Sequence, residues 1–222
     1  MTALELVGVK PTTIIMCCDA LSKDQSWFSL RPHLGSLRRL DLSLLLDKKY
    51  GVNVDMVGVN FLLALQQCTV LEELSLSFNN SVEEGDAFDC LASAVLLPQL
   101  RRFVCSESDC HTLSMMRFLS NHAATLKSCD LSFIGFWRRD AVEFTDLLNM
   151  IRESMRLEQL ALYECDEGYS RLRFPDMIKV RSGSEPNDDG YIIVELDETI
   201  SLKGYDEVQS GLACMLKCMR KD

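Results

Sequence analysis

Apolar and polar residues alternate in the same way at several separate places along this chain. The clearest place is residues 71–79, Leu-Glu-Glu-Leu-Ser-Leu-Ser-Phe-Asn. Residues two positions apart on a strand point to the same face of a sheet, so Leu74 and Leu76 predict a strand with one buried face. Asn79 is predicted to turn the chain by hydrogen bonding the neighbouring backbone. A single strand of this kind cannot bury its apolar face, so it needs neighbours with the same pattern.

Four further segments share this spacing and give the chain a repeating organisation. They are residues 37–42, 100–105, 126–131 and 157–165, while Leu4 and Leu6 look like a shortened first copy. The shared pattern, L-x-x-L-x-L-x-x-N, is typical of leucine-rich repeats. Several independent matches make this interpretation stronger than any one of them, because L-x-L alone is common in ordinary strands.

The repeats are irregular in length. Their equivalent positions are Leu4, Leu40, Leu74, Phe103, Cys129 and Leu160. Successive positions are between 26 and 36 residues apart, whereas leucine-rich repeats usually span about 20–29 residues, so the longer steps predict full α-helices between the strands. We therefore predict an α/β leucine-rich-repeat solenoid of about six repeats, with a curved parallel sheet on the concave face and helices on the convex face.

Apolar residues at helical spacing fill the segments between these strands. Pro11, which suits the first turn of a helix, precedes Ile14, Cys18 and Leu21, and this spacing predicts a helix near the start of the chain. Further helices are predicted at about residues 54–67, 83–95, 112–124 and 139–155. The buried stripe of the helix at 112–124 is predicted to be Leu113, Met116 and Leu119. The strongest stripe, in the helix at 139–155, consists of Phe144, Leu147, Leu148, Ile151 and Met155.

The pattern changes after residue 165, and we divide the chain there. Residues 1–165 are predicted to form the leucine-rich-repeat arc, and residues 166–222 a C-terminal capping region. The capping region contains an acidic loop at residues 182–190 and predicted strands at 191–196 and 200–202. It ends in a predicted helix with Val208, Leu212, Met215 and Met219 on one side. A solenoid exposes an apolar face at each end, which is why such a cap is expected.

The polar residues between the leucines are predicted to point outward from the concave face, where a partner protein can bind. They form three columns across the strands. One column is mostly serine, which leaves room for a partner, and another alternates in sign for three strands, so that neighbours can pair. The alternative interpretation is that they are tolerated filler in a tight parallel stack. The predicted binding residues are Arg38, Asp41, Ser43, Glu72, Ser75, Ser77, Arg101, Ser106, Asp130, Ser132, Glu158 and Tyr163.

The acidic composition narrows the choice of partners. The chain of 222 residues has a formal net charge of −10 at pH 7 and a pI near 4.8. Such a surface repels phosphate backbones, so nucleic acid is not an expected partner. No signal peptide and no apolar run of roughly 20 residues is visible, so a membrane is not an expected partner either. The placement of the 10 cysteines, mostly on predicted strands and helices, predicts reduced thiols and a cytoplasmic or nuclear location.

Candidate catalytic and metal-binding residues are few. Cys110 and His111 lie near Cys105, but their spacing matches no zinc pattern, and Cys214 with Cys218 has no second pair. No phosphate-binding glycine loop and no nucleophile-elbow motif occurs. We therefore predict no metal, no cofactor and no enzymatic activity. A thiol-dependent hydrolase that uses Cys110 and His111, or Cys105, is the alternative.

Residues 118–126, Phe-Leu-Ser-Asn-His-Ala-Ala-Thr-Leu, are followed by a strand and then by Trp137. This arrangement resembles filamentous-fungal F-box proteins with degenerate leucine-rich repeats, over residues 34–165. The resemblance implies that His122 and Trp137 are structural, with His122 capping free carbonyls at the end of a helix. In that family an N-terminal F-box binds the Skp1 adaptor. No F-box is visible ahead of the first repeat here, so a Skp1-like adaptor is not among the partners that these residues predict.

The expected function is a scaffold for protein–protein interaction, because stacked repeats present an extended and rigid surface. The resemblance implies a more specific version, in which the repeats are the substrate-recognition part of an SCF-type ubiquitin ligase. Two alternatives stay open beside it: the thiol-dependent hydrolase, and a truncated repeat protein with no independent role.

Overall fold

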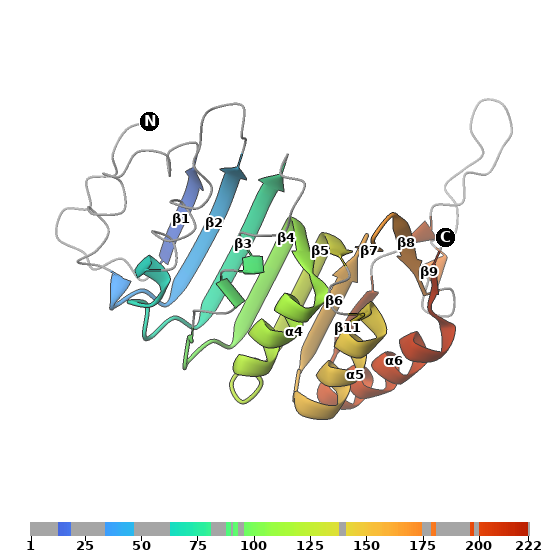
Figure 1. Cartoon of the computed structure of the whole chain (residues 1–222). Helices are drawn as coiled ribbons and strands as arrows, with labels where there is room; N and C mark the ends of the chain where they lie inside the picture. Colours follow the sequence, from blue (N-terminus) through green and yellow to red (C-terminus); the bar gives the residue numbers. More distant parts are fainter. Residues whose placement is uncertain are drawn as a thin grey trace, which may run out of the picture.

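The structure is a computed structural model of the chain. It describes residues 13–18, 34–46, 63–80, 88–89, 91–92, 96–137, 141–174, 179–180, 196–197 and 200–221. In this part of the chain an open, mostly parallel sheet crosses the molecule, and the helices lie on one of its faces (Figure 1). The prediction of a mixed α/β fold with a parallel sheet is therefore confirmed.

The parallel strands follow one another in the sheet in the order of the sequence. Each pairs with the next one along the chain. They are β1 (Thr13–Cys18), β2 (Arg39–Leu46), β3 (Glu73–Asn80), β4 (Arg102–His111), β5 (Ser128–Trp137) and β6 (Gln159–Tyr163). The predicted register is confirmed for five strands, because the positions paired across them are Leu40, Leu74, Phe103, Cys129 and Leu160.

Two predictions about the strands are wrong. Thr13–Cys18 is a strand and not part of a helix, and Ile14 is the residue that pairs with Leu40. The consecutive β-branched residues at positions 13–15 favour a strand more than the apolar spacing favours a helix. Leu4, the predicted partner of Leu40, lies outside the described residues. Asn79 does not turn the chain, because β3 continues through it and pairs it with Leu45.

The helix α4 (Thr112–Asn121) matches the predicted helix, but its buried face differs from the predicted one. Met115, Phe118 and Leu119 are fully buried, whereas Leu113 and Met116 are partly exposed. The packing around Phe118 explains this choice, because its ring lies 4.6 Å from that of Phe103 in β4, centroid to centroid. The buried face is therefore set by an aromatic contact to the sheet.

The helix α5 (Phe144–Ser154) buries the stripe that its spacing predicts, from Phe144 to Met155. It begins later than predicted, at Phe144, because Glu143 caps it. The Glu143 side chain accepts a hydrogen bond from the backbone N–H of Asp146, and the Asp146 carboxylate accepts one from the Glu143 N–H at 2.9 Å. Glu167, which is 4% exposed, accepts the Phe144 N–H at 3.0 Å and joins this helix start to the sheet.

His122 ends α4 and caps it, as expected. Its Nδ1 donates to the Phe118 carbonyl at 2.7 Å, and its Nε2 accepts the Leu97 N–H at 3.0 Å. These two bonds require the neutral imidazole, with the proton on Nδ1. Burial lowers the pKa of His122 below its ordinary value, and the bond to the Phe118 carbonyl opposes that shift. His122 therefore fixes the end of α4 against the loop that precedes β4.

The C-terminal part adds mostly antiparallel strands. They are β7 (Asp166–Glu167), β8 (Ser170–Arg173), β9 (Lys179–Val180), β10 (Leu196–Asp197), β11 (Ile200–Lys203) and β12 (Arg220–Lys221). β11 lies antiparallel on β6, and β8 lies antiparallel between β7 and β12. Residues 166 and 167 form β7 and pair in parallel with β5. β9 and β10 form a separate pair.

The terminal helix α6 (Tyr205–Cys218) is confirmed, with Val208, Leu212 and Met215 buried. It packs closely on β11, because a Cβ on Gly211 would lie 2.4 Å from a methyl group of Leu202. The acidic loop at 182–190 lies outside the described residues, and the boundary at residue 165 stays a prediction.

Three neighbouring strands bend at the same level. Glu107, Phe133 and Glu164 have φ values of 51°, 54° and 45°, in the left-handed region that side chains rarely adopt. Ser106 pairs with Ser132 before the bend, and Ser108 pairs with Ile134 after it. We call residues 102–106, 128–132 and 159–163 the lower strand segments. Residues 108–111, 134–137 and 165–168 are the upper strand segments.

Candidate protein-binding face

The sheet has one packed face and one open face. Along the lower strand segments, every second residue is buried and the residues between are partly exposed. The buried residues face the helices, which cover one side of the sheet in Figure 1. The residues between them therefore form an open face, and they are the residues that the sequence predicts as the binding surface.

Two predicted columns lie side by side across this open face, as the pattern requires. The first column consists of Asp41, Ser75, Val104, Asp130 and Ala161. The second runs Ser43, Ser77, Ser106, Ser132 and Tyr163. Ser132 donates to Asp130 at 2.9 Å, and Ser77 donates to Glu107 at 3.4 Å. The serines thus orient carboxylates on the open face.

The third predicted column precedes the strands and forms a ladder of backbone hydrogen bonds. It consists of Arg38, Glu72, Arg101, Lys127 and Glu158. Two ion pairs link its members: Arg38 with Glu72 at 2.9 Å, and Lys127 with Glu158 at 3.3 Å. The predicted pairing is confirmed for these two. Their side chains are well exposed, so each pair contributes about 0–1 kcal/mol to stability.

Two pairs of aromatic side chains lie along these strands, one at the bend and one at the end of the upper strand segments. Phe133 is 47% exposed, and its ring lies 4.8 Å from that of Tyr163 in a T-shaped contact. Trp137 meets Tyr169, which is 97% exposed, at 5.4 Å. The sequence pattern predicts Tyr163 as a binding residue and misses Phe133 and Tyr169. The alternation of apolar and polar residues does not predict that Phe133 is exposed, because Phe133 stands at the bend, where the period of two is interrupted.

A polar row crosses the upper strand segments. The register places Asp109, Gly135, Asp166 and Arg171 next to one another on β4, β5, β7 and β8. Arg171 bonds to Asp166 at 3.0 Å and to Glu164 at 3.1 Å. The Asp109 carboxylate lies so close over Gly135 that a Cβ there would be 2.1 Å from its Oδ1.

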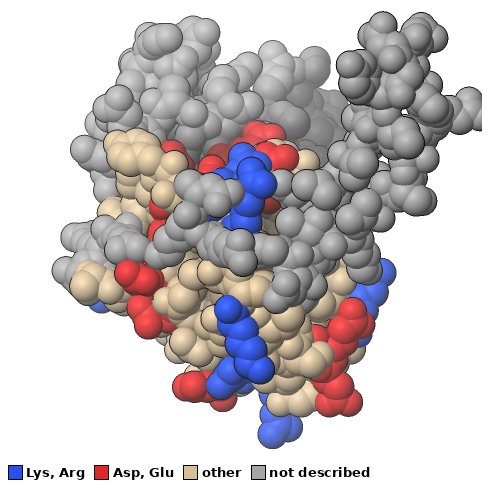
Figure 2. Space-filling view, turned by 90° about the vertical axis from the view of Figure 1, so that its right-hand side faces the viewer, with Lys and Arg blue, Asp and Glu red and all other residues tan. Residues whose placement is uncertain are grey.

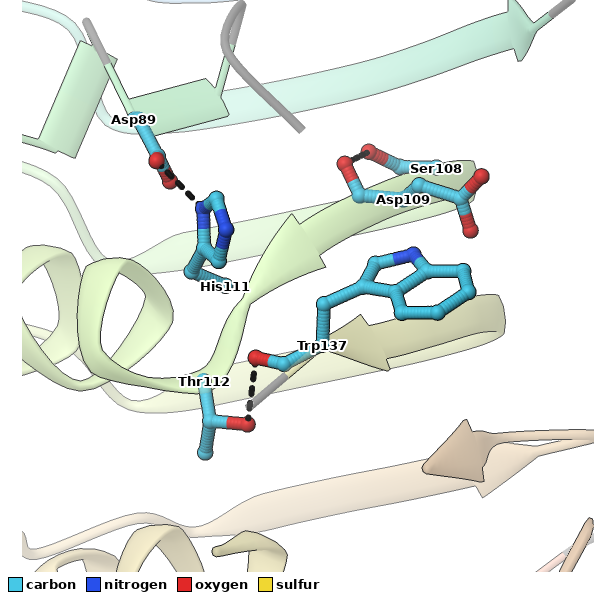
Figure 3. Close-up of polar contacts among 6 residues, drawn as sticks. All are labelled: Asp89, Ser108, Asp109, His111, Thr112 and Trp137. Carbon is cyan, nitrogen blue, oxygen red and sulfur yellow. Dashed lines mark hydrogen bonds and ion pairs between the residues drawn. The ribbon is translucent and has the colours of Figure 1, made fainter. Parts of the chain in front are cut away.

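The Asp109 carboxyl has a shifted pKa. Burial raises its pKa above the ordinary value, the Trp137 side chain opposes the rise, and the negative charge of Asp166 adds to it. Figure 3 shows the indole N–H edge of Trp137 turned toward Asp109. Burial and the neighbouring carboxylate of Asp166 therefore both disfavour the charged form of Asp109.

The cysteines proposed for thiol chemistry do not fit it. Cys105 and Cys110 are 0% exposed, and burial raises the pKa of Cys105 to about 12 and that of Cys110 well above its ordinary value. A reactive cysteine needs an accessible thiolate. His111 follows Cys110 on the strand and so points to the other side. Its Nδ1 lies 2.5 Å from a carboxylate oxygen of Asp89. Figure 3 shows the imidazole ring turned toward this carboxylate.

Other kinds of site have little support in the described residues. No group of three or more His, Cys, Asp or Glu side chains among them is placed to hold a metal ion. The helices of the described residues are too short or too polar to cross a bilayer. On the side where α6 lies, Figure 2 shows basic and acidic side chains interspersed among neutral ones, with no broad patch of either sign.

Neither the protein-family models nor the curated proteins nor the solved structures contain a match to this chain.

Proposed function

We propose that this chain is a leucine-rich-repeat solenoid that binds another protein through the open face of a curved sheet. The observation that supports it is the register of five strands. Their buried positions Leu40, Leu74, Phe103, Cys129 and Leu160 are paired at one level on the packed face, and the polar columns are aligned on the open face. Such a surface is extended, and its shape is set by the packed core beneath it.

The detail of the sixth repeat also supports the leucine-rich-repeat assignment. Its ninth position is Cys165, where the consensus has Asn or Cys. Cys165 is buried, and its Sγ lies 3.6 Å from the Leu131 carbonyl of the preceding repeat. A side chain at this position thus satisfies a backbone group of its neighbour, which is a physical reason for the consensus to keep a small polar or thiol residue there.

The more specific version of the proposal is substrate recognition for an SCF-type ubiquitin ligase. The capped helix end at His122, which the F-box resemblance implies, favours it over an unrelated repeat protein. Capture of a ligase adaptor together with a second protein would support this version. Capture of partners without any adaptor would remove it and leave the general function.

Affinity capture with matched variants tests the proposal. The full chain is immobilised, and proteins retained from a lysate of its own organism are quantified by mass spectrometry. Asp130→Lys changes the charge of the open face, and Glu153→Lys makes the same change on the exposed side of α5. We expect Asp130→Lys to lose partners that the unchanged chain and Glu153→Lys both retain. Equal losses in the two variants, or none, would contradict the proposal.

A further inference from the structure

We propose that the open face takes an extended, cationic segment of a partner protein, with an arginine or lysine side chain over Phe133 and between the carboxylates of Glu107 and Asp130. This inference rests on the proposed protein-binding function and names the chemistry of the partner. The basis is a sheet face on which, among the described residues, an exposed aromatic ring lies with more acidic than basic groups.

Phe133 is the anchor of this surface. Its ring is 47% exposed although phenylalanine is usually buried, and its backbone is held at φ 54°. The edge-on contact with Tyr163 at 4.8 Å fixes the ring in place. The face of an aromatic ring attracts a guanidinium or an ammonium group, and arginine is the more frequent partner.

Acidic groups flank this ring. Glu107 stands at the same bend on the neighbouring strand, and strands are about 4.8 Å apart. Asp130 precedes Phe133 by three residues on β5, and neither side chain is buried. Ser77 and Ser132 donate hydrogen bonds to these two carboxylates, which orients them but leaves their charge.

Charge balance on the open face favours a cation from outside. The described acidic residues of this face, from the column of Asp41 and Asp130 to the upper strand segments, are Asp41, Glu107, Asp109, Asp130, Glu164 and Asp166. The described basic residues on this side of the sheet are Arg171, which already bonds to Glu164 and Asp166, and the exposed Arg173, and both lie on β8. Among the described residues, the excess of acidic groups therefore lies on the β4 and β5 side, around Phe133. The same charge repels nucleic acid and anionic lipid.

The columns next to Phe133 suit an extended chain. Ser75, Ser77, Ser106 and Ser132 are small and partly exposed, so a backbone can approach the sheet across them. A chain in extended conformation places alternate side chains on one side, and so it can direct several cations toward the face.

Fluorescence anisotropy of the full chain with synthetic probes tests the inference. The probe is a labelled peptide of about 12 residues with arginine at alternate positions, and its control carries neutral citrulline at the same positions. We expect the arginine peptide to bind and the citrulline peptide to bind at least about tenfold more weakly. The affinity for the arginine peptide falls as salt is raised, because the contacts are screened.

Variants with the same change in charge locate the site. Glu107→Gln with Asp130→Asn is expected to weaken binding about tenfold, and Phe133→Leu about threefold. Glu153→Gln with Glu207→Gln, on α5 and α6, is expected to leave the affinity unchanged. If the double variant does not fold, Glu107→Gln and Asp130→Asn are measured singly against Glu153→Gln, because salt dependence alone does not locate the site on a chain with a net charge of −10.

Two results overturn the inference. One is equal binding of the arginine and citrulline peptides; the other is equal weakening by the two pairs of substitutions. If either occurs while Asp130→Lys still loses captured partners, the face binds protein by other chemistry and the proposed function stands. If Asp130→Lys also loses nothing, the proposed function fails as well.

Discussion

In β4 and β5 the lower and upper segments belong to one continuous strand, and in the third case they are the successive strands β6 and β7, yet the two sets of segments differ in how the sequence encodes their positions. In the lower segments, Phe103 and Cys105 are buried two residues apart, as on any half-buried strand. Across the bend the buried positions are three residues apart, as in Cys105 and Ser108. The left-handed residue between them adds one position and shifts the alternation. A local backbone feature thus decides which side chains reach the open face above it.

This phase shift has a functional consequence. It brings Asp109, Gly135 and Asp166 to one level on the partly exposed side, and it leaves Phe133 exposed at the bend. The lower segments give a flat array of small polar residues, whereas the bend and the upper segments concentrate charge and aromatic rings. Binding energy in protein interfaces is concentrated in aromatic and arginine contacts. The region around the bend therefore carries the more specific part of the proposed surface.

The largest expected effect tests whether the two sets of segments share one core. Leu131→Ala removes a fully buried side chain below the bend, and Ile134→Ala removes one above it. Each is expected to lower the free energy of unfolding by about 3 kcal/mol, because both leave cavities in the same packed layer. Urea unfolding followed by circular dichroism measures the change, with Ser132→Ala as the control. A much smaller cost for Ile134→Ala would show that the upper segments are only loosely joined.

The next effect concerns the helix end that positions the lower segment of β4. His122→Ala leaves the Leu97 N–H and the Phe118 carbonyl without their partner in a buried place. We expect a loss of about 2 kcal/mol in the free energy of unfolding at pH 7.5. Ser120→Ala, two residues away at an exposed position of α4, is the control and should cost far less.

The same residue gives a pH dependence with a defined sign. Because the pKa of His122 is lower in the folded chain than its ordinary value of 6.5, the unfolded chain binds the proton more readily. The contribution of the neutral imidazole is complete above about pH 6.5 and is lost as the pH falls from there toward the folded-state pKa. The stability difference between the unchanged chain and His122→Ala should therefore be smaller at pH 5.5 than at pH 7.5. An equal difference at both values would contradict this assignment.

A moderate effect tests the close approach in the upper segments. Gly135→Ala places a methyl group against the Asp109 carboxylate, so one of the two must move, and we expect a cost of about 1–2 kcal/mol. Asp109→Ala in the same chain should recover most of it, and a double-mutant cycle measures this coupling. Gly35→Ala is the control, because nothing lies within 4 Å of a Cβ at that glycine. Additive effects of the substitutions at 109 and 135 would contradict the contact.

The comparison also explains what could be predicted from the sequence. Leucine-type residues at positions such as Leu74 and Phe103 predict the register of the lower segments, because burial of one face leaves no other alignment. The bend is not predictable in this way, since Glu107, Phe133 and Glu164 are not the glycine or asparagine that usually mark a left-handed residue. Without the bend, neither the row through Gly135 nor the exposure of Phe133 follows from the spacing. Tyr163 is predicted as a binding residue, and the residues that surround it are not.

The smallest expected effect tests the bend itself. Glu107 is exposed and adopts φ 51°, which costs a residue with a long side chain more than it costs asparagine or glycine. Glu107→Asn should therefore be more stable than Glu107→Gln by about 0.5 kcal/mol, although both remove the same charge. Thermal unfolding measured side by side resolves this difference, with Ser77→Ala in both chains so that the hydrogen bond from Ser77 to position 107 does not contribute. If Glu107→Gln is the more stable, position 107 is not left-handed in solution, and the phase shift that separates the upper segments from the lower ones loses its physical basis.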